Sequence, residues 1–205
     1  KGFDDLRTGL KVGQTIDVTW VDIEDVERAH SPKGLAEDNP LGDELGVFMQ
    51  GKAQGAATFA RLEGCWYGNN LVYLVSTSGG DKQAGQVWQF DPREQQLKLV
   101  FESPGVEVLD SPDNITVSPR GGLVLCEDGD AVPHRLHGMT PEGRLFPFAT
   151  NNVVLNGEHN GIRGDFRHEE WTGATFSPDG QWLFVNIQTP GITMAITGPW
   201  DNGLL

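Results

Sequence analysis

The chain has 205 residues, of which 38% are hydrophobic and 21% charged, a composition typical of globular proteins that bury a core. Its 29 acidic residues outnumber 15 basic ones, so the formal net charge is -14. This charge argues against a nucleic-acid partner, because phosphate backbones attract basic surfaces. It fits bound cations better, although most of these side chains are expected simply to form a solvated acidic surface. No segment approaches the roughly 20 apolar residues that span a bilayer, so no membrane partner is expected.

Two further features restrict the class of protein. Both cysteines, Cys65 and Cys126, lie in apolar runs and form no CxxC pair, which favours buried thiols over a single disulfide or a metal ligand. The sequence starts at Lys1 without an apolar signal segment, so we expect a processed chain or a part of a longer one. The missing signal segment therefore says nothing about the compartment.

Residues 1–58 are predicted to form an N-terminal segment of loops and short helices. In VDIEDVERAH, residues 21–30, acidic residues come early and basic residues late, which suits the dipole of a short helix. A second helix is expected within residues 43–60, running into the first strand, although its glycines disfavour a long one. The residues between the two helices are expected to form a loop.

One plan recurs in the remainder of the chain. NITVSPRGGLVLCED, residues 114–128, and GATFSPDGQWLFVNIQ, residues 173–188, each read as a strand, a Ser-Pro-x-Gly turn and an apolar strand. EGCWYGNNLVYLVST, residues 63–77, follows the same plan with Gly-Asn-Asn at the turn. Second hairpins follow in residues 85–103 and 135–149. Each complete unit therefore has four strands.

A four-stranded antiparallel unit that recurs every ~40–60 residues is typical of a β-propeller blade. We predict an all-β fold in which residues 59–205 form a partial β-propeller of about three four-stranded blades, near residues 59–103, 113–149 and 170–205. Closed propellers usually have four or more blades, because each blade buries its faces against neighbours. We expect the open edge strands to pair with the rest of a parent propeller or with a second copy.

Acidic and amide side chains recur near the first strands of these units and at the end of one second strand. The residues concerned are Glu63, Asp113, Asn114, Glu127, Asp128 and Glu170. The first strand of a propeller blade lines the central channel, so these side chains are expected to converge near the axis. Crowded carboxylates repel one another unless a cation compensates them, and oxygen ligands suit a hard cation such as Ca²⁺. The alternative interpretation is that they are turn caps and exposed strand ends.

Arg61 lies two residues before Glu63, so both side chains are expected on one face of a strand. An arginine beside metal-bound carboxylates can neutralise them as a structural ion pair. It can also offer its planar guanidinium to an anionic substrate, most naturally a phosphate. The residues alone leave both roles open.

Three blocks of the sequence resemble the PhoX-type alkaline phosphatases. They are FARLEG at residues 59–64, DSPDNITVSPRGGLVLCEDG at residues 110–129 and EEWTGATFSPDGQWLFVNIQTPGITMAITGPW at residues 169–200. The likeness covers most of the chain from about Gly55 and corresponds to the C-terminal part of the family's longer chain. It implies a six-bladed propeller, exported by the twin-arginine route and hence periplasmic or secreted, that hydrolyses phosphomonoesters with calcium and iron.

The resemblance also implies roles for individual residues. Arg61 would be the catalytic residue that contacts phosphate, and Glu63 would bind metal. Further cation ligands would come from Asp113, Asn114, Glu127, Asp128 and Glu170. Ca²⁺ and Fe³⁺ would neutralise the phosphate and activate a water or oxide nucleophile. The family's N-terminal blades, with an iron-binding cysteine, have no counterpart in this sequence, which leaves the activity of the isolated chain open.

Two alternative functions use the same oxygen ligands. A calcium-dependent propeller lactonase or phosphotriesterase would act on an uncharged substrate and would not depend on Arg61. A non-catalytic binding propeller would be stabilised by calcium without turning over any ester.

Overall fold

The computed structural model describes residues 4–28, 46–200 and 205. The first sheet has the order β1-β5-β4-β3-β2 and consists of β1 (Thr15–Asp17), β2 (Leu62–Gly68), β3 (Leu71–Ser76), β4 (Gln86–Asp91) and β5 (Gln96–Glu102). The second, β6-β7-β8-β9, consists of β6 (Pro112–Val117), β7 (Leu123–Glu127), β8 (Arg135–Met139) and β9 (Leu145–Thr150). The third consists of β12 (Trp171–Phe176), β13 (Leu183–Ile187) and β14 (Ile192–Ile196). The described chain is thus mostly β, as predicted.

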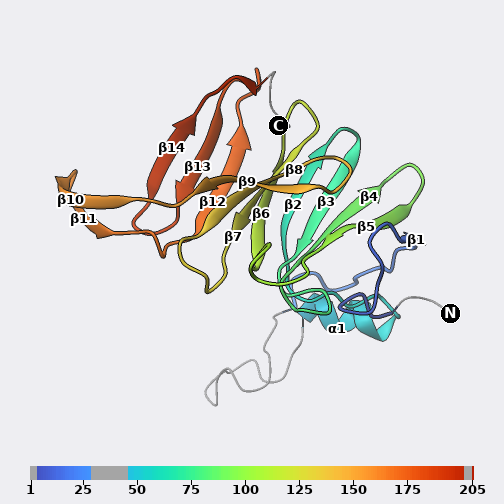
Figure 1. The fold of residues 1–205 in the computed structure, drawn as a ribbon. Coiled ribbons are helices and arrows are strands. Elements are labelled where there is room, and N and C mark those ends of the chain that lie inside the picture. The colour runs from blue at the N-terminus through green and yellow to red at the C-terminus, as the bar shows by residue number, and fades with distance from the viewer. Residues whose placement is uncertain (1–3, 29–45, 201–204) are drawn as a thin grey trace, which may run out of the picture.

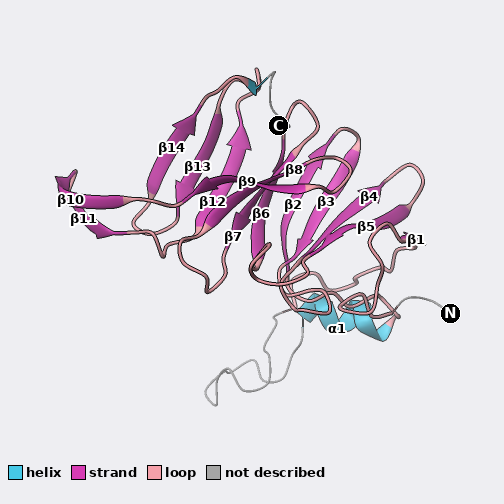
Figure 2. Cartoon of the chain, viewed as in Figure 1, coloured by secondary structure: helices cyan, strands magenta, loops and turns pink. Residues whose placement is uncertain are grey.

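The three sheets are antiparallel and follow one another in space in chain order, from β1 at one end to β14 at the other (Figure 1). A separate hairpin of β10 (Val154–His159) and β11 (Ile162–Asp165) connects the second sheet to the third and extends away from them (Figure 2). The hairpin was not expected from the sequence. The third sheet has three strands where the complete units have four.

Apolar side chains fill the spaces between successive sheets. Strand β7 contributes to both of its neighbours, with Leu123 and Leu125 in the core shared with the first sheet and Val124 and Cys126 in the core shared with the third. Side chains alternate along a strand, so a strand covered on both faces reads as a continuous apolar run. The middle sheet is therefore buried on both faces and fixes the sheets on either side of it.

The N-terminal segment covers the outer face of the first sheet. Leu6 packs there with Trp88 and Leu99, and Phe59 meets Trp88 edge to face with ring centroids 5.5 Å apart. Strand β1 extends the same sheet by pairing Ile16 with Leu97 of β5. This strand was not expected, because only three residues form it and its partner lies far along the chain.

The predicted helix over residues 21–30 is wrong for its described part, residues 21–28, which contains turns and bends but no helix. The main-chain amide and carbonyl of Asp25, which a helix would bond internally, form hydrogen bonds with the side chain of Gln50 instead. Its Nε2 donates to the carbonyl of Asp25 at 2.7 Å, and its Oε1 accepts from the amide of Asp25 at 3.0 Å. The last two residues of the expected helix lie outside the described residues.

The second expected helix is present as α1 (Gly46–Ala53), shorter than the predicted range of residues 43–60. Residues 43–45 lie outside the described residues. The helix ends because Gly55 adopts a φ of 86°, and the amide of Ala56 returns to the carbonyl of Gly51 at 2.9 Å. In the described residues no helix is long and apolar enough to cross a membrane.

Candidate metal centre

The first strands of the three sheets lie beside one another, with β6 in contact with both β2 and β12. Each of these strands has a shift in its pairing register near its start, where two residues face one on the partner strand. The shifts fall between Leu62 and Cys65, between Pro112 and Ile115, and between Thr172 and Thr175. Such β-bulges bend a strand and re-aim its side chains, often beside active sites. The repeat in the sequence thus corresponds to a repeated bulge in the structure.

The bulges determine which acidic residues are equivalent. Glu63 and Asp113 occupy the first bulge position of their strands, and Gly173 occupies it in β12. Glu170 lies three residues earlier, directly before β12. The predicted correspondence therefore holds for Glu63 and Asp113, whereas Glu170 approaches from a different point of the repeat.

Two glycines allow β2 to pack closely on β6. A Cβ on Gly64 would collide with the main-chain carbonyl of Asp113, and a Cβ on Gly68 would lie 2.7 Å from the Cβ of Val117. Larger side chains at either position would push the two strands apart. The glycines of EGCWYG therefore set the distance between the first two bulges.

Three of the predicted ligands come together at this end of the sheets. One carboxylate oxygen from each of Asp113, Asp128 and Glu170 lies within 4.8 Å of the others. They belong to β6, to the loop after β7 and to the residue before β12. We refer to these three residues as the carboxylate cluster.

Crowding and burial disfavour negative charge in the carboxylate cluster. Burial, a hydrogen bond with Asp128 and the charges of Asp128 and Asp113 raise the pKa of Glu170 to about 8. Burial and the charges of Glu63 and Asp128 also raise the pKa of Asp113, against an opposing effect of Arg61. A shared proton or a bound cation is therefore needed to compensate the cluster near neutral pH.

Arg61 and Glu63 form an ion pair, with Arg61 Nη2 3.2 Å from Glu63 Oε1. The reason predicted for their proximity is wrong. Arg61 precedes β2 and has a φ of 52°, so the two side chains do not alternate along one strand. The left-handed residue and the following bulge bring them together instead. The pair lies near enough to Asp113 to influence its pKa.

The side chain of Asn114 links strands rather than joining the carboxylates. Its Oδ1 accepts a hydrogen bond from the main-chain amide of Ala174 at 2.9 Å, and Cys126 Sγ lies 3.9 Å from the same atom. This contact joins β6 to β12. The predicted role of Asn114 as a ligand stays a prediction.

Glu127 is also outside the carboxylate cluster, and its side chain is 2% exposed. Burial raises the pKa of Glu127, but hydrogen bonds from His137, Arg135 and the amide of Asp110 lower it below its ordinary value. Arg135 and His137 were not among the site residues predicted from the sequence. The available signal was their spacing, because residues two apart in β8 point to the same face and can both reach an acidic residue on the adjacent strand.

The residues of the cluster fit a hard cation. All three offer oxygen, and Ca²⁺ prefers oxygen ligands, taking about six to eight of them. Burial raises the pKa of the Cys126 thiol, which opposes thiolate ligation there. The described residues thus offer three oxygen ligands of the kind that a hard cation prefers, fewer than a calcium ion takes.

Residues 4–191 match the family model of the alkaline phosphatase PhoX. Pseudomonas fluorescens PhoX in complex with vanadate, a transition state analogue, has a similar structure, with a TM-score of 0.53 and 20% sequence identity. That match covers 76% of this chain and 36% of the PhoX chain. No curated protein matches the sequence.

A weaker likeness is to 1,3Gal43A, an exo-β-1,3-galactanase from Clostridium thermocellum, with a TM-score of 0.40 and 12% identity over 70% of this chain and 37% of that one. At this score a shared fold is not established. The chain spans little more than a third of the PhoX structure, and its stacked sheets resemble part of the PhoX propeller. The resemblance read from three sequence blocks is confirmed, because the family model covers most of the chain. The chain belongs to the alkaline phosphatase PhoX family.

Proposed function

We propose that the chain is part of a metal-dependent phosphomonoester hydrolase of the alkaline phosphatase type. The observation that carries this proposal is the carboxylate cluster, in which oxygens of Asp113, Asp128 and Glu170 lie within 4.8 Å of one another. Family membership supports the same activity. Since the chain spans 36% of the PhoX structure, the complete site would include groups from outside the matched region.

The carboxylate cluster would hold calcium, and the raised pKa values of Asp113 and Glu170 support a site that needs positive charge. Fe³⁺ is proposed as a second ion on the family resemblance. Such ions neutralise phosphate charge and lower the pKa of a bound water. Glu63, close enough to affect the pKa of Asp113, would contribute a further carboxylate oxygen.

Arg61 would bind and orient the phosphate. Its side chain is 57% exposed, and among the described residues Glu63 anchors one of its nitrogens at 3.2 Å. The remaining N–H groups of a guanidinium can donate in parallel to two phosphate oxygens. Hydrogen bonds of this kind stabilise charge on the transferring phosphoryl group.

Metal analysis and a phosphatase assay test the proposal together. The chain is incubated with calcium and iron, dialysed exhaustively and analysed for metal, beside Glu170→Gln. We expect the unaltered chain to retain calcium and the variant to lose it, because the substitution removes a carboxylate from the cluster. Hydrolysis of p-nitrophenyl phosphate that vanadate inhibits would support phosphoryl transfer. Calcium in neither protein would contradict the proposed site.

The same assays separate the alternatives. Turnover of a lactone or a neutral phosphotriester that survives Arg61→Ala would favour the hydrolase for uncharged substrates. A calcium-dependent rise in melting temperature without turnover of any ester would favour a binding propeller. Family membership favours the phosphatase over both.

We further propose a periplasmic or secreted location, on the family resemblance.

We also propose that the chain associates through the third sheet, which consists of β12, β13 and β14. Trp182, directly before β13, and Phe184, within it, are 42% and 39% exposed, although both are large apolar residues. Residues two apart in a strand share a face, so they form one apolar surface that further blades or a second copy could cover. Light scattering that gives only monomers would contradict association with a second copy.

A further inference from the structure

Glu127 precedes Asp128 of the carboxylate cluster, and protein groups surround its carboxylate. Arg135 binds both oxygens, through Nη2 to Oε1 at 2.7 Å and Nε to Oε2 at 2.8 Å. Oε1 also lies 2.9 Å from His137 Nε2 and accepts from the main-chain amide of Asp110 at 2.9 Å. The side chains of Glu127 and His137 are each 2% exposed. These bonds hold the carboxylate in one orientation, turned toward β8.

Arg135 also connects this group to the segment that leads into β6. Its Nη1 donates to the carbonyl of Glu107 at 3.0 Å. In the same segment, Ser111 lies two residues before Asp113, and its carbonyl accepts a hydrogen bond from the main-chain amide of Asp128 at 3.0 Å. The approach to β6 is therefore bonded both to Arg135 and to the main chain of Asp128. This arrangement fixes Asp113 relative to Asp128.

The loop after Asp128 is tied to the third carboxylate in a similar way. The ring of His134, which is 5% exposed, lies with Nε2 2.7 Å from the carbonyl of Gly129. The carbonyl of His134 accepts from the indole Nε1 of Trp171 at 3.2 Å, and Trp171 follows Glu170. Both ends of the loop that begins at Asp128 are thus held, one by Glu127 and Arg135 and the other by Trp171.

We propose that Glu127 is a positioning residue, which acts through Arg135 to set the separation of Asp113 and Asp128, rather than a metal ligand. This inference rests on the proposed cation site. Replacement of residues that orient metal ligands typically weakens metal binding by 10–100-fold. Arg135 offers no ligand oxygen, so its removal separates a positioning role of the pair from ligation by Glu127.

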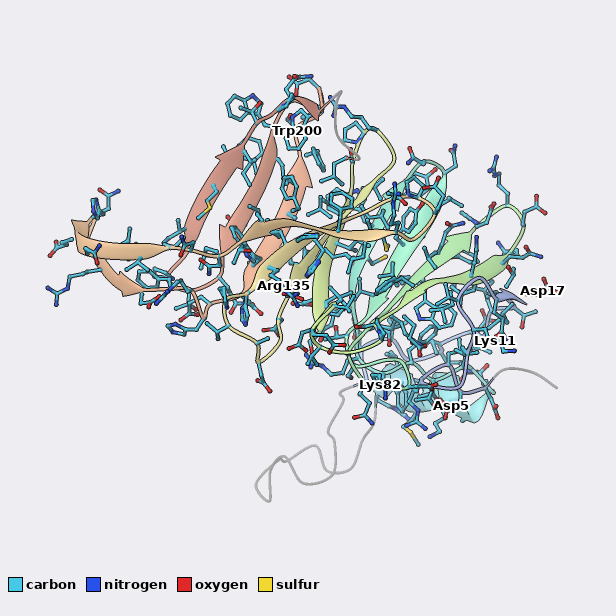
Figure 3. The ribbon with its side chains drawn as sticks, in the orientation of Figure 1. Asp5, Lys11, Asp17, Lys82, Arg135 and Trp200 are labelled. Atoms are coloured by element: carbon cyan, nitrogen blue, oxygen red, sulfur yellow. The ribbon has the colours of Figure 1, made fainter. Side chains whose placement is uncertain are left out.

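The test compares Arg135→Ala and Arg135→Lys with a matched control. Arg7→Ala removes the same charge and a similar two-nitrogen contact, since Arg7 Nε and Nη2 bind Asp5 at 2.9 and 2.7 Å. Figure 3 shows Arg135 near the middle of the molecule and Asp5 at the N-terminal end. Calcium dissociation constants of the 205-residue chain are measured by isothermal titration calorimetry, and metal-free unfolding is followed by circular dichroism.

We expect Arg135→Ala to raise the calcium dissociation constant by about 10–100-fold, Arg135→Lys to recover part of the loss and Arg7→Ala to leave it unchanged. If Glu127 itself binds calcium, Arg135→Ala frees its carboxylate and the affinity stays equal or increases, which overturns the proposal. A variant that melts earlier but binds calcium normally while folded also overturns it. If Arg135→Ala does not fold, Arg135→Lys decides by the same criterion. An unaltered chain that binds no calcium overturns the cation site itself.

Discussion

Gly64 in β2 lies against the main-chain carbonyl of Asp113 in β6, closer than any side chain at position 64 would permit. The side chain of Ile115 approaches the same position, with Cγ2 3.0 Å from where a Cβ would stand. Asp113, in the bulge of β6, can therefore occupy its position only because residue 64 of β2 is a glycine.

Gly64→Ala is expected to destabilise the fold and disturb the carboxylate cluster at once. The added methyl group must displace β6 backbone, and overpacking of this kind costs about 1–3 kcal/mol. Urea unfolding measures the loss of stability, and calorimetric titration measures the expected fall in calcium affinity. Gly157→Ala serves as control, because the nearest atom to a Cβ there is His159 Nε2 at 4.0 Å. Equal effects of the two substitutions would contradict the close contact.

Stability of the metal-free chain is expected to fall as pH rises, because of Glu170. Its pKa is raised from 4.5 to about 8 in the folded state, so between these values the folded chain holds a proton that the unfolded chain has lost. This contribution to stability is complete below pH 4.5 and is lost as pH rises through about 8.

Melting temperatures recorded from pH 5 to 9 in the presence of a chelator test this expectation against Glu170→Gln. The amide cannot ionise, so the variant should lack this component of the pH dependence. Saturating calcium should also flatten the profile, since the cation replaces the proton. Identical slopes in the unaltered chain and in Glu170→Gln would refute the raised pKa.

Arg61→Ala is expected to impair phosphate chemistry without unfolding the protein. The ion pair with Glu63 is exposed, so the free energy of unfolding should change by no more than about 0.5 kcal/mol. Loss of one donor to a transition-state oxygen typically lowers kcat by about 100–1,000-fold. The assay uses p-nitrophenyl phosphate with a preparation that shows activity, and Arg93→Ala, another exposed arginine, is the control. Unchanged kcat/KM would remove Arg61 from the site.

Trp200→Ala is expected to separate the second and third sheets. The indole is 8% exposed, stacks on Phe148 of β9 at 6.2 Å and meets Phe176 of β12 at 5.7 Å. Replacement of a buried aromatic residue by alanine usually costs about 3–5 kcal/mol. Denaturant unfolding should give a loss of this size, whereas Tyr67→Ala, at a residue 62% exposed, should cost far less. A loss below 1 kcal/mol for Trp200→Ala would contradict the packing.

The sheets were predictable because their signals are local. In the turn after β6, the amide of Ser118 bonds to the carbonyl of Gly122 at 2.7 Å, and Gly121 supplies a φ of 100°. A Ser-Pro-x-Gly sequence encodes such a turn by itself. Strand β1 was not expected, and the helix expected over residues 21–30 was wrong, because partners elsewhere in the chain determine the conformation of both segments. The partner is Leu97 for β1 and Gln50 for the residues around Asp25.

The site was predictable in part. Side-chain chemistry and position near strand ends identified Asp113, Asp128 and Glu170, which the fold brings together, whereas the repeat itself relates Asp113 only to Glu63. They could not identify the orientation of Glu127, because the partners that turn it toward β8 are known only once strands are paired. The bulges also depend on the register between strands, and no single strand sequence reveals an extra residue.

Each bulge reverses the parity of its strand. Residues before it alternate in one phase, and residues after it alternate in the opposite phase, so one strand can present an acidic group at its start and still direct Ile115 and Val117 into the core. Deletion of Asp113 or Asn114 would leave a single residue opposite Cys126 and restore a regular ladder, with Ile115 still paired to Leu125 and Val117 to Leu123. The extra residue is therefore needed to present the acidic group at the start of the strand, and not to keep Ile115 and Val117 in the core.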